Sequence, residues 1–90
     1  MNLYEAFASL EGPREAERFL KDLCTPKEIK DFQDRWQIAK LLDKRKLSYR
    51  EISEKTGASL TTVTRVARFL KDEPNKGYVL MLKKAKTKFK

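Results

Sequence analysis

The chain has 90 residues, of which 21 are basic and 13 acidic, so its formal net charge at pH 7 is +8. This length fits one small domain, and a hydrophobic share of 40% is enough for a packed core. The only cysteine, Cys24, excludes an internal disulfide and fits a reducing cytosol. No apolar run approaches the roughly 18 residues of a membrane span, and no signal peptide is evident. We therefore expect a cytoplasmic protein with no membrane partner.

The positive charge is concentrated toward the C-terminal end. Residues 1–24 carry three basic and five acidic groups, whereas residues 65–90 carry nine basic and two acidic groups. A positive balance in one part of a chain favours a polyanionic partner, nucleic acid before an anionic membrane. A basic surface without a specific partner is the alternative.

Apolar residues recur at helical spacing along almost the whole chain, so we expect an all-α fold with six helices. Leu3, Phe7 and Leu10 predict a first helix, which ends at Gly12. Pro13 suits the first position of a second helix. The expected inner face of that helix consists of Ala16, Phe19, Leu20 and Leu23.

A third helix is expected from about residue 26 to residue 44. Thr25 and Glu28 form a capping box, with Pro26 at the first helical position. Its apolar residues form two faces, Ile29, Phe32, Trp36 and Ala39 on one and Ile38, Leu41 and Leu42 on the other. A helix that is apolar on two sides is expected at the centre of the fold, with neighbours on both sides.

Two shorter helices and a C-terminal helix follow. Ser48 and Glu51 form a second capping box, which opens a helix that Gly57 ends. Ser59 caps the next helix, which should reach about residue 70. A sixth helix is marked by Tyr78, Met81, Leu82 and Ala85. Residues 83–90 are expected to form a mobile basic tail, and residues 1–90 a single domain.

The first two helices should be about ten residues each, which is shorter than isolated helices tolerate in water. They therefore need packing partners. In a chain of 90 residues a second copy can supply these partners, so an intertwined homodimer is the economical arrangement.

Residues 49–68 fit a helix-turn-helix unit, and with its flanking residues the motif spans about 48–70. Ser53 is small where the two helices approach, and Gly57 supplies the positive φ of the turn. Val63 and Val66 anchor the second helix inward. The outward positions are then Ser59, Leu60, Thr61, Thr64, Arg65 and Arg68.

The outward residues suit double-stranded DNA. Small hydroxyls let a helix enter the major groove closely and bond phosphates or base edges, and Leu60 can touch a thymine methyl. Arg50, in the first turn of the preceding helix, can reach guanine. Lys44 and Lys46 are expected near the DNA backbone; an exposed helix end that favours cations is the alternative.

Three stretches carry a resemblance to a known family: "RFLKDLCTPKEIKDFQDRWQIAKLL", "LSYREI" and "TGASLTTVTRV". They resemble the tryptophan repressor superfamily, and most closely its bacterial YerC/YecD branch, over roughly residues 14–72. The resemblance implies a six-helix intertwined homodimer whose two helix-turn-helix heads read successive major grooves of a pseudo-palindrome. It also places Arg50, Leu60, Thr61 and Thr64 where the repressor contacts DNA.

The resemblance further implies an amino-acid pocket between the third helix and the recognition helix. Thr25, Arg35 and Arg65 match positions that hold tryptophan in the repressor, and arginines suit a carboxylate. Val66 stands where the repressor has glycine, and Phe69 replaces a serine with a ring that can fill the indole space. We therefore expect that tryptophan is not the effector and that no small ligand is obligatory. A regulator with a different small anionic effector is the alternative.

The residue types argue against an enzyme. The chain has no histidine, no base beside its cysteine, no glycine-rich phosphate loop and no metal-spaced ligand set, so we expect no cofactor and no metal. The sequence predicts a dimeric, sequence-specific DNA-binding transcriptional regulator, most simply a repressor. The alternative is an RNA-binding or protein-interaction module on the same motif. RNA readers commonly expose stacking aromatics, and within the motif only Tyr49 is expected to be exposed.

Overall fold

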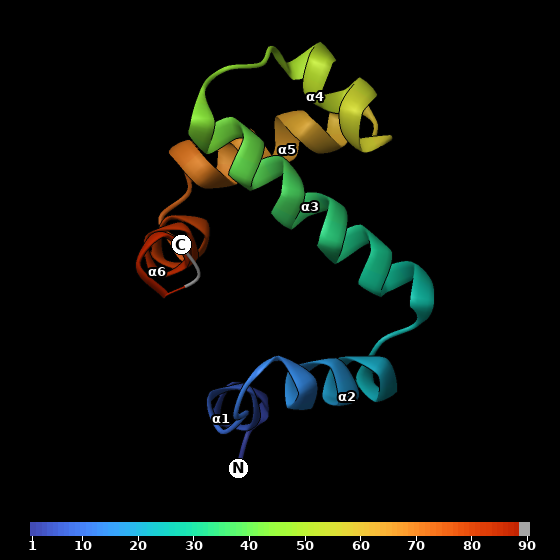
Figure 1. The fold of residues 1–90 in the computed structure, drawn as a ribbon, viewed down its shortest axis with the longest axis vertical. Coiled ribbons are helices and arrows are strands. Elements are labelled where there is room, and N and C mark those ends of the chain that lie inside the picture. Colours follow the sequence, from blue (N-terminus) through green and yellow to red (C-terminus); the bar gives the residue numbers. More distant parts are fainter. Residues whose placement is uncertain (89–90) are drawn as a thin grey trace. The chain divides into compact units, whose positions relative to one another are not determined.

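The structure is a computed structural model that describes residues 1–88, which contain α-helices and no strand (Figure 1). The helices are α1 (Leu3–Ala8), α2 (Pro13–Leu23), α3 (Pro26–Lys44), α4 (Tyr49–Thr56), α5 (Leu60–Lys71) and α6 (Gly77–Lys88). The predicted all-α fold is therefore confirmed. The chain divides into two compact units, residues 1–31 and the residues from Phe32 onward. None of the helices in the described part is long and apolar enough to cross a membrane.

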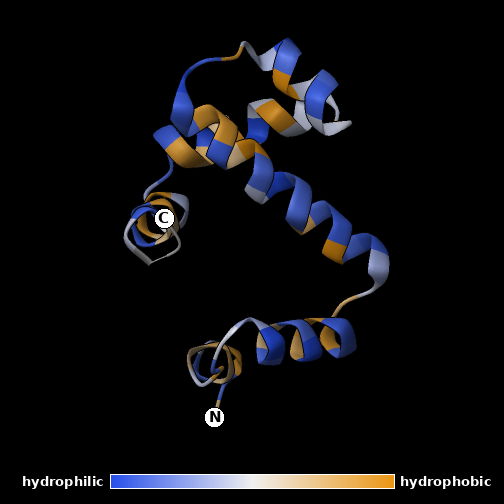
Figure 2. Cartoon of the chain, in the orientation of Figure 1, coloured by the Kyte–Doolittle hydropathy of each residue, from blue (hydrophilic) through white to orange (hydrophobic). Residues whose placement is uncertain are grey.

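The N-terminal unit contains α1, α2 and the start of α3. Asn2 caps α1 through a reciprocal box: its side chain accepts from the Glu5 backbone N–H at 2.9 Å, and Glu5 Oε1 accepts from the Asn2 N–H at 2.8 Å. The Phe7 and Phe19 rings meet edge to face with their centroids 5.3 Å apart. Apolar and hydrophilic positions are interspersed along α2 (Figure 2), yet no residue of α1 or α2 is buried. The expected inner face of α2 is therefore only partly covered: Ala16, Phe19 and Leu20 are half-buried, and Leu23 is 48% exposed.

The capping box predicted at the start of α3 is present. The Thr25 N–H donates to Glu28 Oε1 at 2.8 Å, and the Glu28 N–H donates to Thr25 Oγ1 at 3.1 Å. The buried residues of α3 are Ile38, Ala39, Leu41 and Leu42. On the other predicted face, Trp36 is half-buried and Phe32 is 45% exposed. Ala39 of that face is nevertheless fully buried and Trp36 packs against the core, so the expectation of neighbours on both sides is met at these two residues but not at Phe32.

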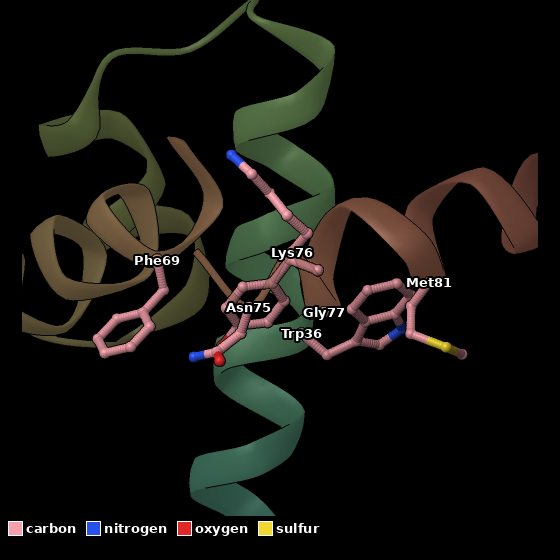
Figure 3. A pocket seen from close by; sticks show the side chains of 7 residues that line it. Trp36, Phe69, Asn75, Lys76, Gly77 and Met81 are labelled. Carbon is pink, nitrogen blue, oxygen red and sulfur yellow. The ribbon is translucent and has the colours of Figure 1, made fainter. Parts of the chain in front are cut away.

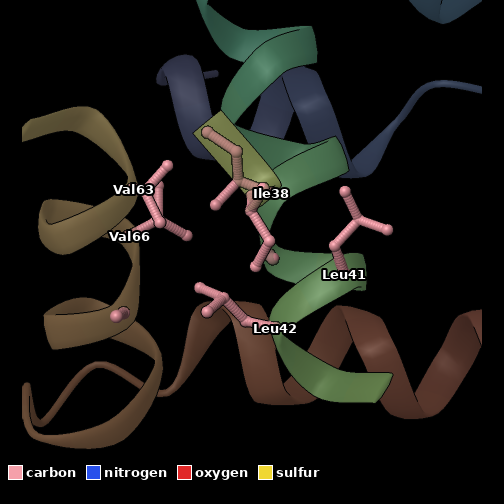
Figure 4. Close-up of a cluster of buried hydrophobic side chains, with 8 residues drawn as sticks. Ile38, Leu41, Leu42, Val63 and Val66 are labelled. Carbon is pink, nitrogen blue, oxygen red and sulfur yellow. The ribbon is translucent and has the colours of Figure 1, made fainter. Parts of the chain in front are cut away.

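The core of the second unit joins α3, α4 and α5, and α5 also packs against α6. The buried cluster consists of Ile38, Ala39, Leu41, Leu42, Ile52, Val63, Val66 and Ala67. Val63 and Val66 are 0% and 1% exposed, and Figure 4 shows both pointing from α5 toward Ile38 on α3. Burial of each such side chain contributes about 1.5–3 kcal/mol to the free energy of folding. The predicted inward face of α5 is confirmed, and its opposite side stays free.

The last helix, α6, begins at Gly77 and continues through Lys88. Residues 83–88 are therefore helical, although they were expected to belong to a mobile tail. Lysine and alanine are good helix formers, and Lys86 Nζ lies 2.9 Å from Asp43 Oδ2. Residues 89 and 90, the end of the expected tail, lie outside the described residues.

Candidate nucleic-acid interface

The first helix of the predicted motif, α4, begins with the expected capping box. The Ser48 N–H donates to Glu51 Oε1 at 2.9 Å, and the Glu51 N–H donates to Ser48 Oγ at 3.1 Å. The Ser48 backbone N–H, and after it the Ser48 hydroxyl, lower the pKa of the Glu51 carboxyl below its ordinary value. The helix ends at Gly57, whose φ of 77° lies in the left-handed region. Both ends of α4 are therefore where the sequence predicts them.

Local hydrogen bonds fix the turn between α4 and α5. The Ser53 hydroxyl donates to the Ala58 carbonyl at 2.6 Å, and the Thr56 hydroxyl donates to the Ile52 carbonyl at 2.8 Å. The Ala58 N–H donates in turn to Thr56 Oγ1 at 3.2 Å. Ser53 is thus more than a small residue at a close approach, since serine and threonine hydroxyls readily bind nearby backbone groups. These bonds set the direction in which α5 leaves the turn.

The hydroxyl groups on the free side of α5 differ in availability. Ser59 caps the helix by accepting from the Thr62 N–H at 3.1 Å. The Thr64 hydroxyl donates to the Leu60 carbonyl at 3.0 Å, so it can only accept from a partner. Within the described residues the exposed Thr61 hydroxyl forms no hydrogen bond, so it can both donate and accept. Thr61 is therefore the most available polar group on this helix.

Five of the predicted outward residues share one open depression of about 370 Å³. The lining residues are Leu60, Thr61, Thr64, Arg65 and Arg68. The depression combines methyl groups, hydroxyls and guanidinium groups, which are the groups that reach base edges and phosphates in a major groove. Arg50, Lys44 and Lys46 are exposed but lie outside its lining. Their contact with DNA stays a prediction, as does that of the lining residues.

The Phe69 ring lies beside two cationic side chains of α5. The guanidinium carbon of Arg65 lies 4.3 Å from the Phe69 ring centroid, and that of Arg68 lies 5.1 Å from it. Both distances suit a cation–π interaction. Arg68 also has its Nε 3.6 Å from Glu73 Oε1, an exposed pair that contributes little to stability. The ring thus limits where the two guanidinium groups can lie.

The residues that the resemblance assigns to an effector pocket each contact different groups in the structure. Val66 belongs to the buried core. Arg35 lies over its own neighbour Phe32, at 5.9 Å from the ring centroid. Thr25 is occupied as the cap of α3. Phe69 lines an open, largely apolar groove of about 380 Å³, shown in Figure 3, with Trp36, Asn75, Lys76, Gly77, Tyr78 and Met81.

Lys71 was not among the predicted contact residues, yet it continues the outward side of α5. It lies three residues after Arg68 and seven after Thr64, a spacing that keeps all three on one side of a helix. Extending the outward stripe by one turn past Arg68 would have included it. The Lys71 ammonium reaches Tyr49 at the start of α4.

Comparisons with known proteins agree with this geometry. A family model described as "Trp repressor protein" matches residues 1–86. The chain is 36% identical over 84 residues to "Uncharacterized protein YerC" of Bacillus subtilis, which covers 93% of this chain and 79% of that protein. It is also 36% identical over 72 residues to a "Trp operon repressor homolog" of Chlamydia trachomatis serovar D, covering 76% of this chain and 77% of that protein. A TrpR-like protein from Eubacterium eligens superposes with a TM-score of 0.84 at 38% identity, covering 93% of this chain and 84% of that chain.

The family model spans nearly the whole chain, so the resemblance indicated by the capping boxes and the turn is confirmed. Proteins of this family are DNA-binding transcription regulators, which agrees with the expectation that the chain is not an enzyme. The chain belongs to the Trp repressor protein family.

Proposed function

We propose that the chain is a sequence-specific DNA-binding repressor that binds a pseudo-palindromic operator as a homodimer. The observation that carries this proposal is the burial of Val63 and Val66 against α3, which leaves the opposite side of α5 free. That side presents the Thr61 hydroxyl, the Leu60 side chain and the guanidinium groups in one depression. A recognition helix of this composition fits a major groove.

The second copy is supported by apolar side chains that the single chain leaves in solvent. Leu3 is 50% exposed, Leu23 is 48% exposed and Phe32 is 45% exposed. Large apolar exposure of this kind is typical of an interface. A symmetric dimer would bring the same surface from each copy to a shared core. It would also carry two recognition helices, as an operator with two half-sites requires.

Tryptophan is not expected to be the effector. In the structure Arg65 already has an aromatic partner, because its guanidinium lies over the Phe69 ring of the same helix. We infer that the Phe69 ring takes the place of a bound indole beside Arg65. Titration calorimetry with L-tryptophan should show no saturable binding, and saturable binding at tens of micromolar would contradict this part of the proposal. Binding of a different carboxylate by Arg35 or Arg65 would support the alternative effector.

The RNA-binding alternative is less favoured by the motif itself. The Tyr49 side chain is 36% exposed, and the Lys71 ammonium near its hydroxyl competes with a base for this ring. A gel-shift competition between duplex DNA and structured RNA separates the two partners. Preference for the RNA would replace the DNA proposal with this alternative.

The decisive experiment is in vitro selection of bound duplexes from a random DNA pool. The recovered sequences should share two inverted half-sites whose centres lie about 34–36 Å apart or a multiple of that distance. If each head neutralises about four phosphates, the log–log salt slope of the dimer should be about −7. A pool without a shared sequence, or a flat salt dependence, would count against the proposal. Sedimentation of the free protein tests the dimer separately.

A further inference from the structure

Tyr49 and Lys71 join the two free ends of the helix-turn-helix unit. Tyr49 is the first residue of α4 and Lys71 is the last residue of α5, 22 positions later. Lys71 Nζ donates a hydrogen bond to the Tyr49 hydroxyl oxygen at 3.2 Å and lies 5.6 Å from the ring centroid. One ammonium group therefore contacts both the ring and the hydroxyl of the same side chain. The Lys71 side chain is exposed, and this bond places its ammonium beside the Tyr49 hydroxyl.

The pair lies on the side of the unit that carries the candidate DNA contacts. Thr61, Thr64, Arg68 and Lys71 follow one another at intervals of three, four and three residues on α5. This spacing places them on one side of the helix, opposite the buried Val63 and Val66. Tyr49 of α4 adjoins this side through its hydrogen bond with Lys71. The pair thus continues the outward surface from one helix to the other.

The chemistry of the pair suits a backbone phosphate. The Tyr49 hydroxyl oxygen accepts a hydrogen bond from the Lys71 ammonium, so its own O–H remains available as a donor. Lys71 keeps two further N–H donors, and within residues 1–88 no carboxylate pairs with it. A hydroxyl that accepts from a cation is polarised and becomes a stronger donor. An O–H donor beside a cation complements the charged oxygens of a phosphodiester.

We propose that Tyr49 and Lys71 together bind one phosphate of the DNA backbone in each protomer, an inference that rests on the proposed DNA-binding function. Lys71 supplies the charge, and Tyr49 positions it while donating its own hydroxyl proton to the phosphate. Because a phosphate carries no base identity, this contact adds affinity without adding sequence preference. It extends the contact surface beyond the predicted residues, which end at Arg68.

The test measures fluorescence anisotropy with two labelled duplexes, one recovered by selection and one of unrelated sequence, between about 50 and 200 mM salt. Lys71→Gln should reduce the salt slope by about 0.9 in each protomer, or about 1.8 in the dimer. The ratio of wild-type affinity to Lys71→Gln affinity should therefore fall about tenfold between the lowest and the highest salt concentration. The fall should be equal on both duplexes. Lys71→Arg should restore the slope. Lys27→Gln is the charge control, since Lys27 is exposed and pairs with Asp31 within α3.

Tyr49→Phe tests the positioning role because it keeps the ring and removes only the hydroxyl. It should weaken binding to both duplexes. Its effect should be smaller in the Lys71→Gln background than in the wild type, since each group acts through the same phosphate. Melting temperatures equal to that of the wild type show that the variants fold. If Lys71→Gln does not fold, the loss of affinity of Tyr49→Phe on both duplexes still tests the contact.

Several results would overturn the inference. An unchanged slope for Lys71→Gln, with steep wild-type binding, would leave the DNA-binding function intact and reject the phosphate contact. An equal loss for Lys27→Gln would show a general charge effect and also reject it. A wild type that binds neither duplex would reject the DNA-binding proposal itself, so the two failures can be told apart.

Discussion

The Arg65 guanidinium lies over the Phe69 ring one helical turn further along α5, with its carbon 4.3 Å from the ring centroid. Arg68 approaches the same ring at 5.1 Å. One aromatic side chain of α5 thus lies within cation–π distance of two guanidinium groups of the same helix.

Phe69→Leu should weaken DNA binding about two- to fivefold, because an exposed cation–π contact contributes about 0.5–1 kcal/mol. Phe69→Tyr keeps the ring and should bind as the wild type does. Anisotropy titrations at fixed salt measure both variants. Equal affinities for the wild type and Phe69→Leu would show that the ring does not order the arginines for DNA.

Thr61→Ala should reduce affinity for the selected operator by about 1–3 kcal/mol if its free hydroxyl contacts a base. Arg50→Ala should have an effect of similar size, and neither change should unfold the protein. Thr87→Ala is the matched control, because its hydroxyl donates to the Lys84 carbonyl in α6. A loss of equal size on unrelated DNA would show that Thr61 contacts the backbone instead.

Ile52→Ala should lower the free energy of unfolding by about 2–5 kcal/mol, because Ile52 is completely buried between helices of the core. Leu60→Ala removes a side chain that is 48% exposed and should change stability little. Urea denaturation measures both. Leu60→Ala should nevertheless lower the affinity for DNA, although the protein stays folded.

Gly57→Ala should destabilise the protein by about 1–2 kcal/mol, because its φ of 77° is unfavourable for any side chain. No atom lies within 4 Å of the added Cβ, so the cost comes from the backbone alone. Arg45 adopts a similar φ of 57°. Arg45→Gly should therefore raise the free energy of unfolding by about 1 kcal/mol. The urea midpoints of the two variants should move in opposite directions, and a shift in the same direction would contradict this account.

Glu51→Gln should remove a pH-dependent part of the stability. The hydrogen bonds from Ser48 lower the pKa of Glu51 in the folded protein. A lowered folded pKa stabilises the protein above the ordinary glutamate pKa, and this contribution is lost as the pH falls through the lowered value. The difference in urea midpoint between wild type and variant should therefore be larger at about pH 7 than at about pH 3. A pH-independent difference would exclude the carboxylate as the cause.

Local chemistry explains what could be predicted from the sequence. The caps at Thr25, Ser48 and Ser59 depend on residues three positions apart, and Gly57 on a single backbone requirement. The inward direction of Val63 also follows from spacing within one helix. These features need no knowledge of the tertiary structure.

Features that depend on tertiary packing or on side-chain rotamers could not be predicted in this way. Periodicity marked Phe32 as apolar, but it does not say which surface covers the ring, and in the single chain it is 45% exposed. The contact between Tyr49 and Lys71 depends on the angle at which α4 and α5 meet. The positions of the Arg65 and Phe69 side chains depend on rotamers that a residue pattern does not specify.

The absence of buried residues in α1 and α2 has a consequence for the proposed dimer. If the proposed dimer covers these helices, their folding and the association of the two copies would form a single equilibrium, which follows mass action. Dilution would then unfold the N-terminal unit at the same time as it separates the recognition helices. Operator occupancy would consequently fall more steeply than the protein concentration, so that gene dosage itself would set a threshold for repression.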